Sequence, residues 1–342
     1  MTSRVPDDDS PGAGQWEALA SRFRRSSNLV ACWQVANSLV PYAALWYAMY
    51  WLSGISWWLV VPVACVAAAL LVRLFIIFHD CGHGSFFSSR RANQITGFIT
   101  GTLTFVPTHM WWSEHAKHHA TSGNLDRRGT GDIWTLTVRE YLESSRWRRF
   151  AYRLARNPFI LFVVAPFFLF VVNYRFAPRN ATARERRSVL FANLAILGVA
   201  AALSAAMGIT TYLLIQCLVL VVSGTAGVWL FYVQHQFEDV YWASGKQWDS
   251  SRAALQGSSY YKLPRVLQWC SGNIGFHHIH HLNPGIPNYH LESCHRSHPS
   301  FDGIKPLTLG ASLQSLRLRL WDDQLKRLVG YPVTVRQRSR DR

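Results

Sequence analysis

The histidines are the residues of this sequence whose types and spacing could do chemistry. Fourteen histidines are present. Ten of them lie in three tight groups: His79 and His83; His115, His118 and His119; and His277, His278, His280 and His281, with His290 shortly after. Residues three or four apart on a helix share one face, so each group can direct imidazoles at one point. An isolated histidine is usually structural and one such pair is weak support, but three groups beside apolar segments favour a metal centre.

The number and type of these ligands limit the chemistry. Imidazole suits iron, copper, zinc and nickel, so ligand type alone leaves the metal open. Eight or nine imidazoles exceed the coordination of one ion, which indicates two metals. A structural zinc site needs four ligands and usually recruits cysteine, and a zinc hydrolase shows three ligands with a glutamate base, as in H-E-x-x-H. Neither pattern is present, and the six cysteines include no C-x-x-C pair, so no disulfide framework or thiolate zinc site is expected.

Long apolar segments separate the histidine groups. Apolar residues make up 49% of the chain and are concentrated in blocks. A membrane-spanning helix needs about 20 apolar residues. Residues 29–52 and 57–78 satisfy this on either side of a short uncharged turn, and residues 189–207 and 210–233 do the same. The sequence therefore predicts an all-α integral membrane protein with four transmembrane helices in two hairpins.

Two further apolar blocks, residues 95–112 and 158–176, are expected to be re-entrant or interfacial helices. The second has arginines on both sides, so one crossing would put basic residues on opposite faces, and Pro166 suggests a break in its middle. The first block contains Gly97, Gly101 and Pro107, so it is also expected to be broken, re-entrant or interfacial. Six full spans are the alternative, but they would place the histidine groups on opposite faces of the membrane.

The basic residues set the expected orientation. The formal net charge is +16, and arginines flank both hairpins: Arg22, Arg24 and Arg25; Arg90 and Arg91; and Arg184, Arg186 and Arg187. The positive-inside rule places these flanks, and with them the histidine-rich cap, on the cytoplasmic face of the cell membrane. Basic runs interleaved with aromatics lie only at the membrane edges, so a nucleic-acid partner is not expected.

The domain organisation is expected to be simple, because no internal repeat is present. Residues 1–28 are expected to form a basic lead-in, disordered over about the first 15 residues, and residues 29–300 one membrane domain. Residues 301–342 are expected to form an amphipathic helix and a basic tail. Within that last segment, Leu313, Leu316, Leu320 and Leu325 lie near one helical face.

The order and spacing of the histidine groups resemble those of the membrane fatty-acid desaturases. The three boxes are HDCGH at 79–83, HAKHH at 115–119 and HHIHH at 277–281. The likeness extends to FYVQHQFED at 231–239, to residues 119–134 and to residues 263–291, and it covers roughly residues 30–300. Within the family, these stretches are most similar to the bacterial acyl-lipid desaturases.

This resemblance implies a di-iron enzyme that uses oxygen and electrons from an external donor to introduce a cis double bond into long acyl chains esterified in membrane lipids. It also implies nine iron ligands, with His235 joining the boxes: His79, His83, His115, His118, His119, His235, His277, His280 and His281. A hydroxylase or ketolase on the same scaffold, acting on a carotenoid or an alkane, is the alternative. A non-catalytic metal carrier would place histidines and acidic residues within the spans, which carry almost none.

The residues near the histidine boxes are expected to support the ligands, and the electrons are expected to come from a separate protein. His278 lies outside the box frame and is expected to be structural, and His109, His290, His295 and His298 are expected to be non-ligands. Carboxylates beside ligand histidines could orient them or lie at the surface, and the side chains concerned are Asp80, Glu114, Asp132 and Glu238, with Asn273 as a further candidate. His298-Pro299 lacks the glycines of a fused cytochrome b5-like domain. A separate acidic ferredoxin or flavodoxin is therefore the expected donor.

Overall fold

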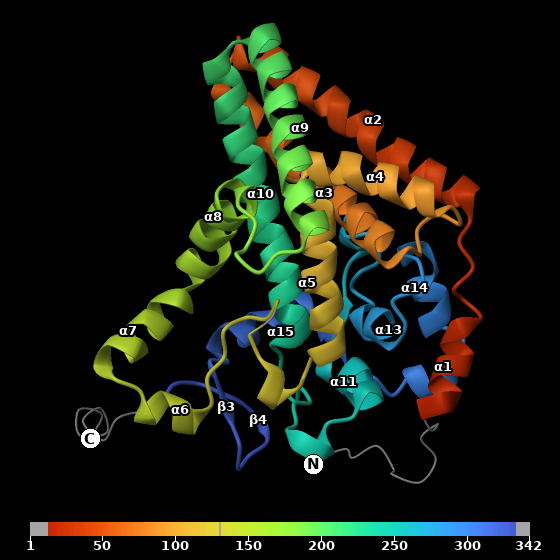
Figure 1. The fold of residues 1–342 in the computed structure, drawn as a ribbon, viewed down its shortest axis with the longest axis vertical. Coiled ribbons are helices and arrows are strands. Elements are labelled where there is room, and N and C mark those ends of the chain that lie inside the picture. Colours follow the sequence, from red (N-terminus) through yellow and green to blue (C-terminus); the bar gives the residue numbers. More distant parts are fainter. Residues whose placement is uncertain (1–12, 130, 333–342) are drawn as a thin grey trace.

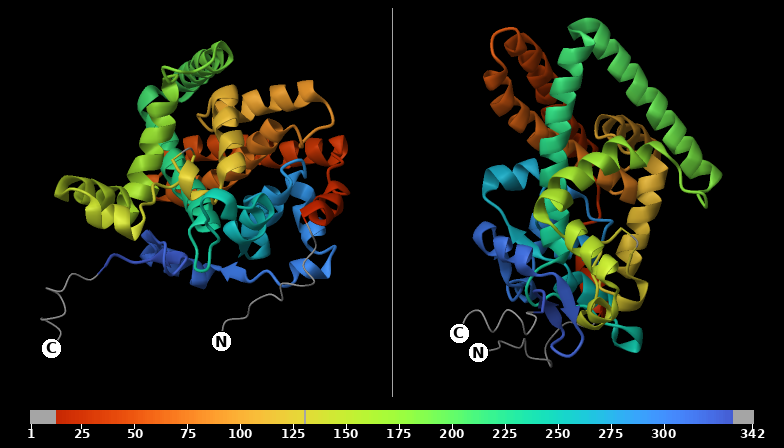
Figure 2. Two further views of the ribbon diagram at one scale, coloured as in Figure 1. Left: turned by 60° about the horizontal axis from the view of Figure 1, so that its bottom comes forward. Right: turned by 90° about the vertical axis from the view of Figure 1, so that its left-hand side faces the viewer.

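The computed structural model describes residues 13–129 and 131–332, and it is built mainly from helices. The four longest helices form two hairpins, α2 (Asn28–Ser53) with α3 (Trp57–His83) and α9 (Ala183–Met207) with α10 (Ile209–His235). Both hairpin turns lie at the upper end of the molecule (Figure 1 and the right-hand view of Figure 2), while the shorter segments gather at the lower end. The predicted pairing of these helices is confirmed.

The apolar length of these helices supports a multi-pass membrane protein. Within the described ranges, α3, α9 and α10 are long and apolar enough to cross a membrane. Helix α2 has a comparable length of 26 residues, but polar positions such as Gln34 and Ser38 interrupt its apolar sequence, and both side chains are buried. A bent helix pair described below is a fourth candidate span.

Local sequence signals fix the helix ends. The Ser27 and Ser56 hydroxyls accept hydrogen bonds from the first turns of α2 and α3. Thr182 and Glu185 form a capping box at the start of α9. Helix α3 ends at Gly84, whose φ of 69° lies in the left-handed region that glycine adopts without steric cost. The first histidine box therefore occupies the last turn of a long helix.

The predicted re-entrant block, residues 158–176, begins at a sharp bend and then continues as consecutive helical segments without the expected break in its middle. Helix α7 (Arg146–Ala155) is followed by a π-helical turn (Ile160–Val164) and by α8 (Ala165–Val171). The chain bends by 63° between α7 and the segment Ile160–Arg175. The bend lies between residues 155 and 160, which include Pro158, and not at Pro166 as expected. Pro166 instead occupies the first turn of α8, where its missing N–H costs little.

The other block expected to be interfacial, residues 95–112, is interrupted between two helices. Helix α4 (Arg90–Leu103) ends before Pro107, and α5 (Thr108–Thr121) starts directly after it. The Trp112 ring lies against Gly82 of α3 and Gly97 of α4, where a side chain at either glycine would overlap it. Its Nε1 donates to the Phe78 carbonyl over 3.2 Å. These contacts lock α5 against the end of α3.

The segment after α10 forms a cap of short elements below the hairpins (Figure 1). It contains α13 (His277–Leu282), which carries the third histidine box. The other cap elements are α11 (Ser250–Gly257), β1 (Tyr260–Lys262), α12 (Arg265–Cys270), α14 (Asn288–His295) and β2 (Pro306–Thr308). Strands β1 and β2 pair in parallel, so the fold is not purely helical.

The ends of the chain differ from expectation. Residues 1–12 lie outside the described ranges, but α1 (Ala13–Ser21) falls within the expected lead-in and is ordered against the cap. Its Trp16 is buried, with its ring centroid 4.9 Å from that of Phe301. Ala20 is buried in the same apolar cluster, and burial of the Trp16 ring stabilises the helix.

The predicted amphipathic helix over residues 312–329 is wrong. A helical turn, α15 (Leu309–Ser312), and a 3-10 turn (Leu313–Arg317) lead into a hairpin of β3 (Leu320–Asp322) and β4 (Arg327–Val329). The Asp322 carboxylate accepts hydrogen bonds from the backbone N–H groups of residues 324 and 325, which fixes the turn. Tertiary burial of Trp321 and Leu328 overrides the helical spacing of the leucines.

We expect Trp321→Ala to destabilise the fold strongly. The Trp321 side chain is fully buried and stacks on Trp242 with a centroid distance of 5.5 Å. Truncating a buried tryptophan costs about 3 to 5 kcal/mol. Thermal unfolding in detergent measures the effect, with Trp147→Ala as the control because Trp147 is 81% exposed. Equal melting temperatures for the two variants would contradict this packing.

Candidate metal centre

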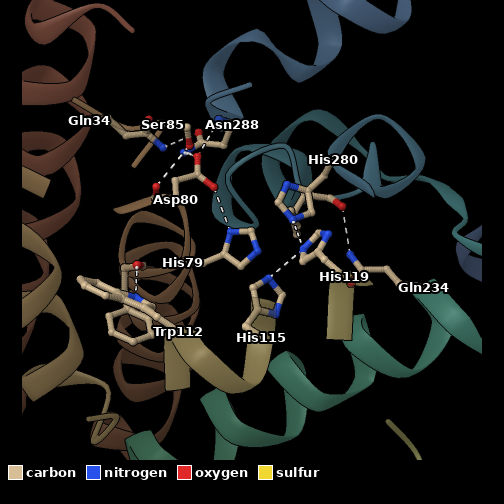
Figure 3. Close-up of polar contacts among 12 residues, drawn as sticks. Gln34, His79, Asp80, Ser85, Trp112, His115, His119, Gln234, His280 and Asn288 are labelled. Carbon is tan, nitrogen blue, oxygen red and sulfur yellow. Dashed lines mark hydrogen bonds and ion pairs between the residues drawn. The ribbon is translucent and has the colours of Figure 1, made fainter. Parts of the chain in front are cut away.

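Four segments bring their histidines to one place at the lower end of the long helices. These are the last turn of α3, the second half of α5, the last turn of α10 and the short helix α13. Figure 3 shows His79, His115, His119 and His280 directed toward one another from three of these segments. Residues separated by some 200 positions in the chain thus share one buried site.

The imidazoles form two adjoining groups. The first contains His79, His83, His115, His119 and His280, and the second contains His118, His235 and His281; within each group the ligand nitrogens lie within 4.8 Å of one another. His277 joins the edge of the second group, with its Nε2 atom 3.0 Å from Nε2 of His235. All nine histidines expected from the sequence are therefore brought together, His235 included.

The spacing of the nitrogens fits metal coordination. Nε2 of His119 lies 3.0 Å from Nε2 of His115 and 2.9 Å from Nε2 of His280, and in the other group Nε2 of His118 and His235 are 3.2 Å apart. Two imidazole nitrogens bound at right angles to a metal at about 2.1 Å would be about 3 Å apart. The arrangement therefore has the dimensions of adjacent ligands on shared ions.

Two carboxylates and a backbone carbonyl contact the Nδ1 atoms of three of the rings. Nδ1 of His79 lies 2.9 Å from an oxygen of Asp80, and Nδ1 of His118 lies 3.0 Å from one of Asp132. Nδ1 of His235 faces the Gly257 carbonyl over 3.4 Å. A proton held at Nδ1 by these acceptors leaves the Nε2 lone pair free to bind a metal. Two of the expected orienting carboxylates, Asp80 and Asp132, are thus found in contact with their histidines.

A buried network that sequence reasoning missed extends this support to α2. The other Asp80 oxygen accepts from the backbone N–H and the side-chain amide of Asn288, at 2.7 and 2.9 Å. The Asn288 side-chain oxygen in turn accepts from Gln34 over 2.8 Å (Figure 3). Gln34 was detectable as a polar residue inside an apolar block. Asn288 carried no such signal, because asparagines are common in loops of this kind.

Burial favours the neutral form of several imidazoles in the site. Burial first, and the neighbouring imidazoles second, lower the pKa of the rings on α5 and α13 well below the ordinary histidine value: His115, His119, His280 and His281. Neutral imidazole is the form that binds metals. In addition, the buried Nε2 atoms of His83 and His281 have no protein hydrogen-bond partner. A metal ion would satisfy these lone pairs, so the residues present fit a metal centre.

The remaining candidates lie apart from the two groups. His278 is fully buried and contacts His295, with 3.1 Å between their ring nitrogens, which agrees with a structural role. Asn273 donates to the Asn288 carbonyl, so it supports the network without touching an imidazole. Glu238 is exposed, and Glu114 lines the cavity described next. Neither carboxylate orients a histidine.

A largely apolar cavity of about 790 Å³ opens beside the histidines, with His79, His115, His118 and His277 in its wall. Its other walls come from α3, α5, α8 and α10, through residues that include Val72, Phe75, Trp111, Phe170, Gly227 and Phe231. The Trp111 ring stacks on His115 with a centroid distance of 4.5 Å. The cavity thus joins the membrane-embedded helices to the imidazole cluster.

Hydrophobic helical hairpins and a buried polyhistidine site define a multi-pass membrane protein with a candidate two-metal centre. The fatty acid desaturase family model matches residues 56–304, and the chain belongs to this family. It is an oxidoreductase that desaturates fatty acyl chains.

Three relatives illustrate the range of similarity. A protein named fatty acid desaturase from Bacillus subtilis (strain 168) is 48% identical over 298 residues, which covers 87% of this chain and 85% of the relative. Two Synechocystis proteins are more distant. The one named sn-1 oleoyl-lipid 12-desaturase is 26% identical, covering 70% of this chain and 68% of the relative. The one named sn-1 acyl-lipid omega-3 desaturase (ferredoxin) is 27% identical, covering 79% and 71%.

We expect Asp80→Asn to weaken metal binding about 10- to 100-fold, the usual cost of losing an outer partner of a ligand histidine. The variant keeps the shape of the side chain but removes the charge that holds the proton on Nδ1 of His79. Metal content after dialysis against graded chelator measures the change. Glu238→Gln serves as the control, because it removes an exposed carboxylate that follows His235 in the sequence. Indistinguishable metal retention by the two variants would refute the orienting role of Asp80.

Proposed function

We propose that the chain introduces a cis double bond into long acyl chains esterified in membrane lipids, at a di-iron centre held by the nine histidines. The observation that carries this proposal is the apolar cavity whose wall includes histidines of both groups. A flexible chain of methylenes fits such a cavity, because its walls offer dispersion contacts and few hydrogen-bonding groups. The names of the cyanobacterial relatives support a lipid-esterified substrate.

The protein side chains in this proposal position the substrate and exclude water. Aromatic rings of Phe75, Trp111 and Phe231 lie along the cavity wall. Gly224 allows α8 to approach α10 closely, since an added Cβ would lie 3.3 Å from Pro166. This close packing keeps the cavity narrow beside α10. An extended acyl chain held there would present adjacent methylenes to the imidazole cluster.

The histidines would divide between two ions. His79, His83, His115, His119 and His280 would hold one iron, and His118, His235, His277 and His281 the other. With oxygen as co-substrate and two external electrons, bound iron would supply the oxidising power needed to remove two hydrogens from an unactivated chain. The chain contributes neutral imidazoles, the carboxylates that fix their tautomers, and a dry cavity.

We also propose the orientation and the electron source. The arginines that flank both hairpins put the histidine-rich cap at the cytoplasmic face of the cell membrane, with four spans in two hairpins. An acidic ferredoxin or flavodoxin would approach this basic face, and electrostatic steering of that encounter weakens as salt rises. One relative, the Synechocystis protein named sn-1 acyl-lipid omega-3 desaturase (ferredoxin), supports this type of donor. The catalytic unit would span residues 29–300, with the described parts of both terminal segments packed against it.

The direct test is product analysis in a host that lacks its own desaturase. Cells expressing the protein should accumulate membrane lipids with new cis double bonds, located by derivatisation and mass spectrometry. His235→Ala should reduce this product by at least about 100-fold, since loss of a ligand should exceed the 10- to 100-fold cost of losing an outer partner. His290→Ala should leave the product unchanged, because His290 lies outside both histidine groups. Oxygenated products would instead assign a hydroxylase or ketolase.

A further inference from the structure

A second concave surface lies on the side of α5 opposite the substrate cavity. Trp111 faces the cavity, whereas its neighbour Trp112 lines two adjoining lobes of about 600 and 660 Å³. The lobes share Gln94, His109, Trp112 and Arg184, so they form one continuous groove between α4, α5 and α9. We refer to it as the α4–α9 groove.

The α4–α9 groove is lined by unpaired positive charge. Arg90, Arg184 and Arg187 are exposed in its wall, and none of them makes an ion pair or hydrogen bond within the described part of the chain. The guanidinium groups of Arg184 and Arg90 lie close enough to His109 to add to the effect of burial in lowering its pKa. The arginines thus converge on the groove from two helices.

One carboxylate, Glu185, lies in the same wall but is already engaged. It accepts hydrogen bonds from the backbone N–H and the hydroxyl of Thr182, at 2.7 and 2.9 Å. Glu185 therefore completes the capping box of α9, and its single negative charge offsets only one of the three arginine charges, so the groove wall keeps a net positive charge. The amino-terminal end of α9, which attracts anions, adds to the positive potential at the same place.

The other end of the α4–α9 groove is apolar. Phe98 of α4 and Phe191 of α9 border it, and both rings are exposed to the surroundings of the protein. Phe191 lies two turns into α9, a candidate span, whereas Arg184 and Arg187 lie in the first turns of that helix. The cationic residues match the phosphate-bearing headgroup of a phospholipid. The aromatic residues, further along the span, match the start of its acyl chains.

We propose that the α4–α9 groove binds the phosphate-bearing headgroup of an anionic phospholipid that is distinct from the substrate lipid. Arg184 and Arg187 would contact the phosphate, since guanidinium groups bind phosphate in a bidentate manner. Phe98 and Phe191 would contact the start of the acyl chains. The lipid would bridge α4 and α9 beside His83, which lines the inner lobe, and would stabilise the packing of α5 on the metal-binding end of α3.

An acidic electron donor could use the same arginines, but the groove favours a lipid. Arg184 and Arg187 lie in a recess with an aromatic border, in the first turns of a candidate span, and lipid headgroups lie at the ends of membrane spans. A protein partner would instead need to insert a side chain past Phe98 and Phe191 to contact these arginines. Electron transfer and lipid retention can be measured separately, so the two occupants are distinguishable.

The experiment compares lipid binding by the purified full-length protein in detergent, using native mass spectrometry with phosphatidylglycerol or phosphatidylcholine. The wild type should retain phosphatidylglycerol preferentially. The double variant Arg184→Gln with Arg187→Gln should bind it at least about tenfold more weakly, because charge-assisted hydrogen bonds are lost. Lysine at both positions should give an intermediate loss, since the charge remains while the bidentate geometry is lost.

The matched control is Arg91→Gln with Arg186→Gln. These arginines are exposed on the same helical turns but do not line the groove, and Arg186 is bonded to nearby carbonyls. The control should bind phosphatidylglycerol like the wild type. An equal loss in the control, an absence of headgroup preference, or full displacement by millimolar inorganic phosphate would overturn the proposal. So would unchanged lipid binding accompanied by slower reduction by a ferredoxin, which would assign the groove to the donor. Metal content, measured alongside, shows whether the metal centre itself is intact.

Discussion

The convergence of nine imidazoles is the constraint on which the rest of the structure depends. Their lone pairs are buried close together, and burying an unsatisfied polar atom costs about 1 to 3 kcal/mol. Metal ions held among these nitrogens would satisfy the lone pairs and remove that cost. The cluster also requires that two helical hairpins end at the same level, because α3 and α10 each carry histidines of the cluster in their last turn.

The supporting structure follows from that requirement. The Gln34, Asn288 and Asp80 network ties α2 and the cap to the first histidine of α3. The Trp112 ring, inserted against Gly82 and Gly97, fixes α5 and with it the second box. These contacts join segments that are distant in the sequence, and the apolar cavity beside them is bordered by a bent segment with a π-helical turn. Such turns frequently occur at functional sites.

The sequence was sufficient to predict the hairpins and the histidines that cluster, because helical spacing and apolar length are local properties. His235 was identified through its neighbouring sequence and not through spacing, since no local pattern connects it to the boxes. The C-terminal hairpin and Trp16 were missed because burial of single aromatic side chains depends on partners distant in sequence. Asn288 was missed for the same reason, and the bend near Pro158 was assigned to the wrong proline.

Metal analysis of the purified protein tests the central claim most directly. Elemental analysis combined with iron K-edge X-ray absorption should give two irons per chain, in shells of nitrogen and oxygen at about 2.1 Å with imidazole scattering. No sulfur shell is expected, because the buried thiols of Cys81 and Cys294 lie outside the histidine groups. A fully active protein with one metal ion per chain, or with iron bound by sulfur, would contradict the account.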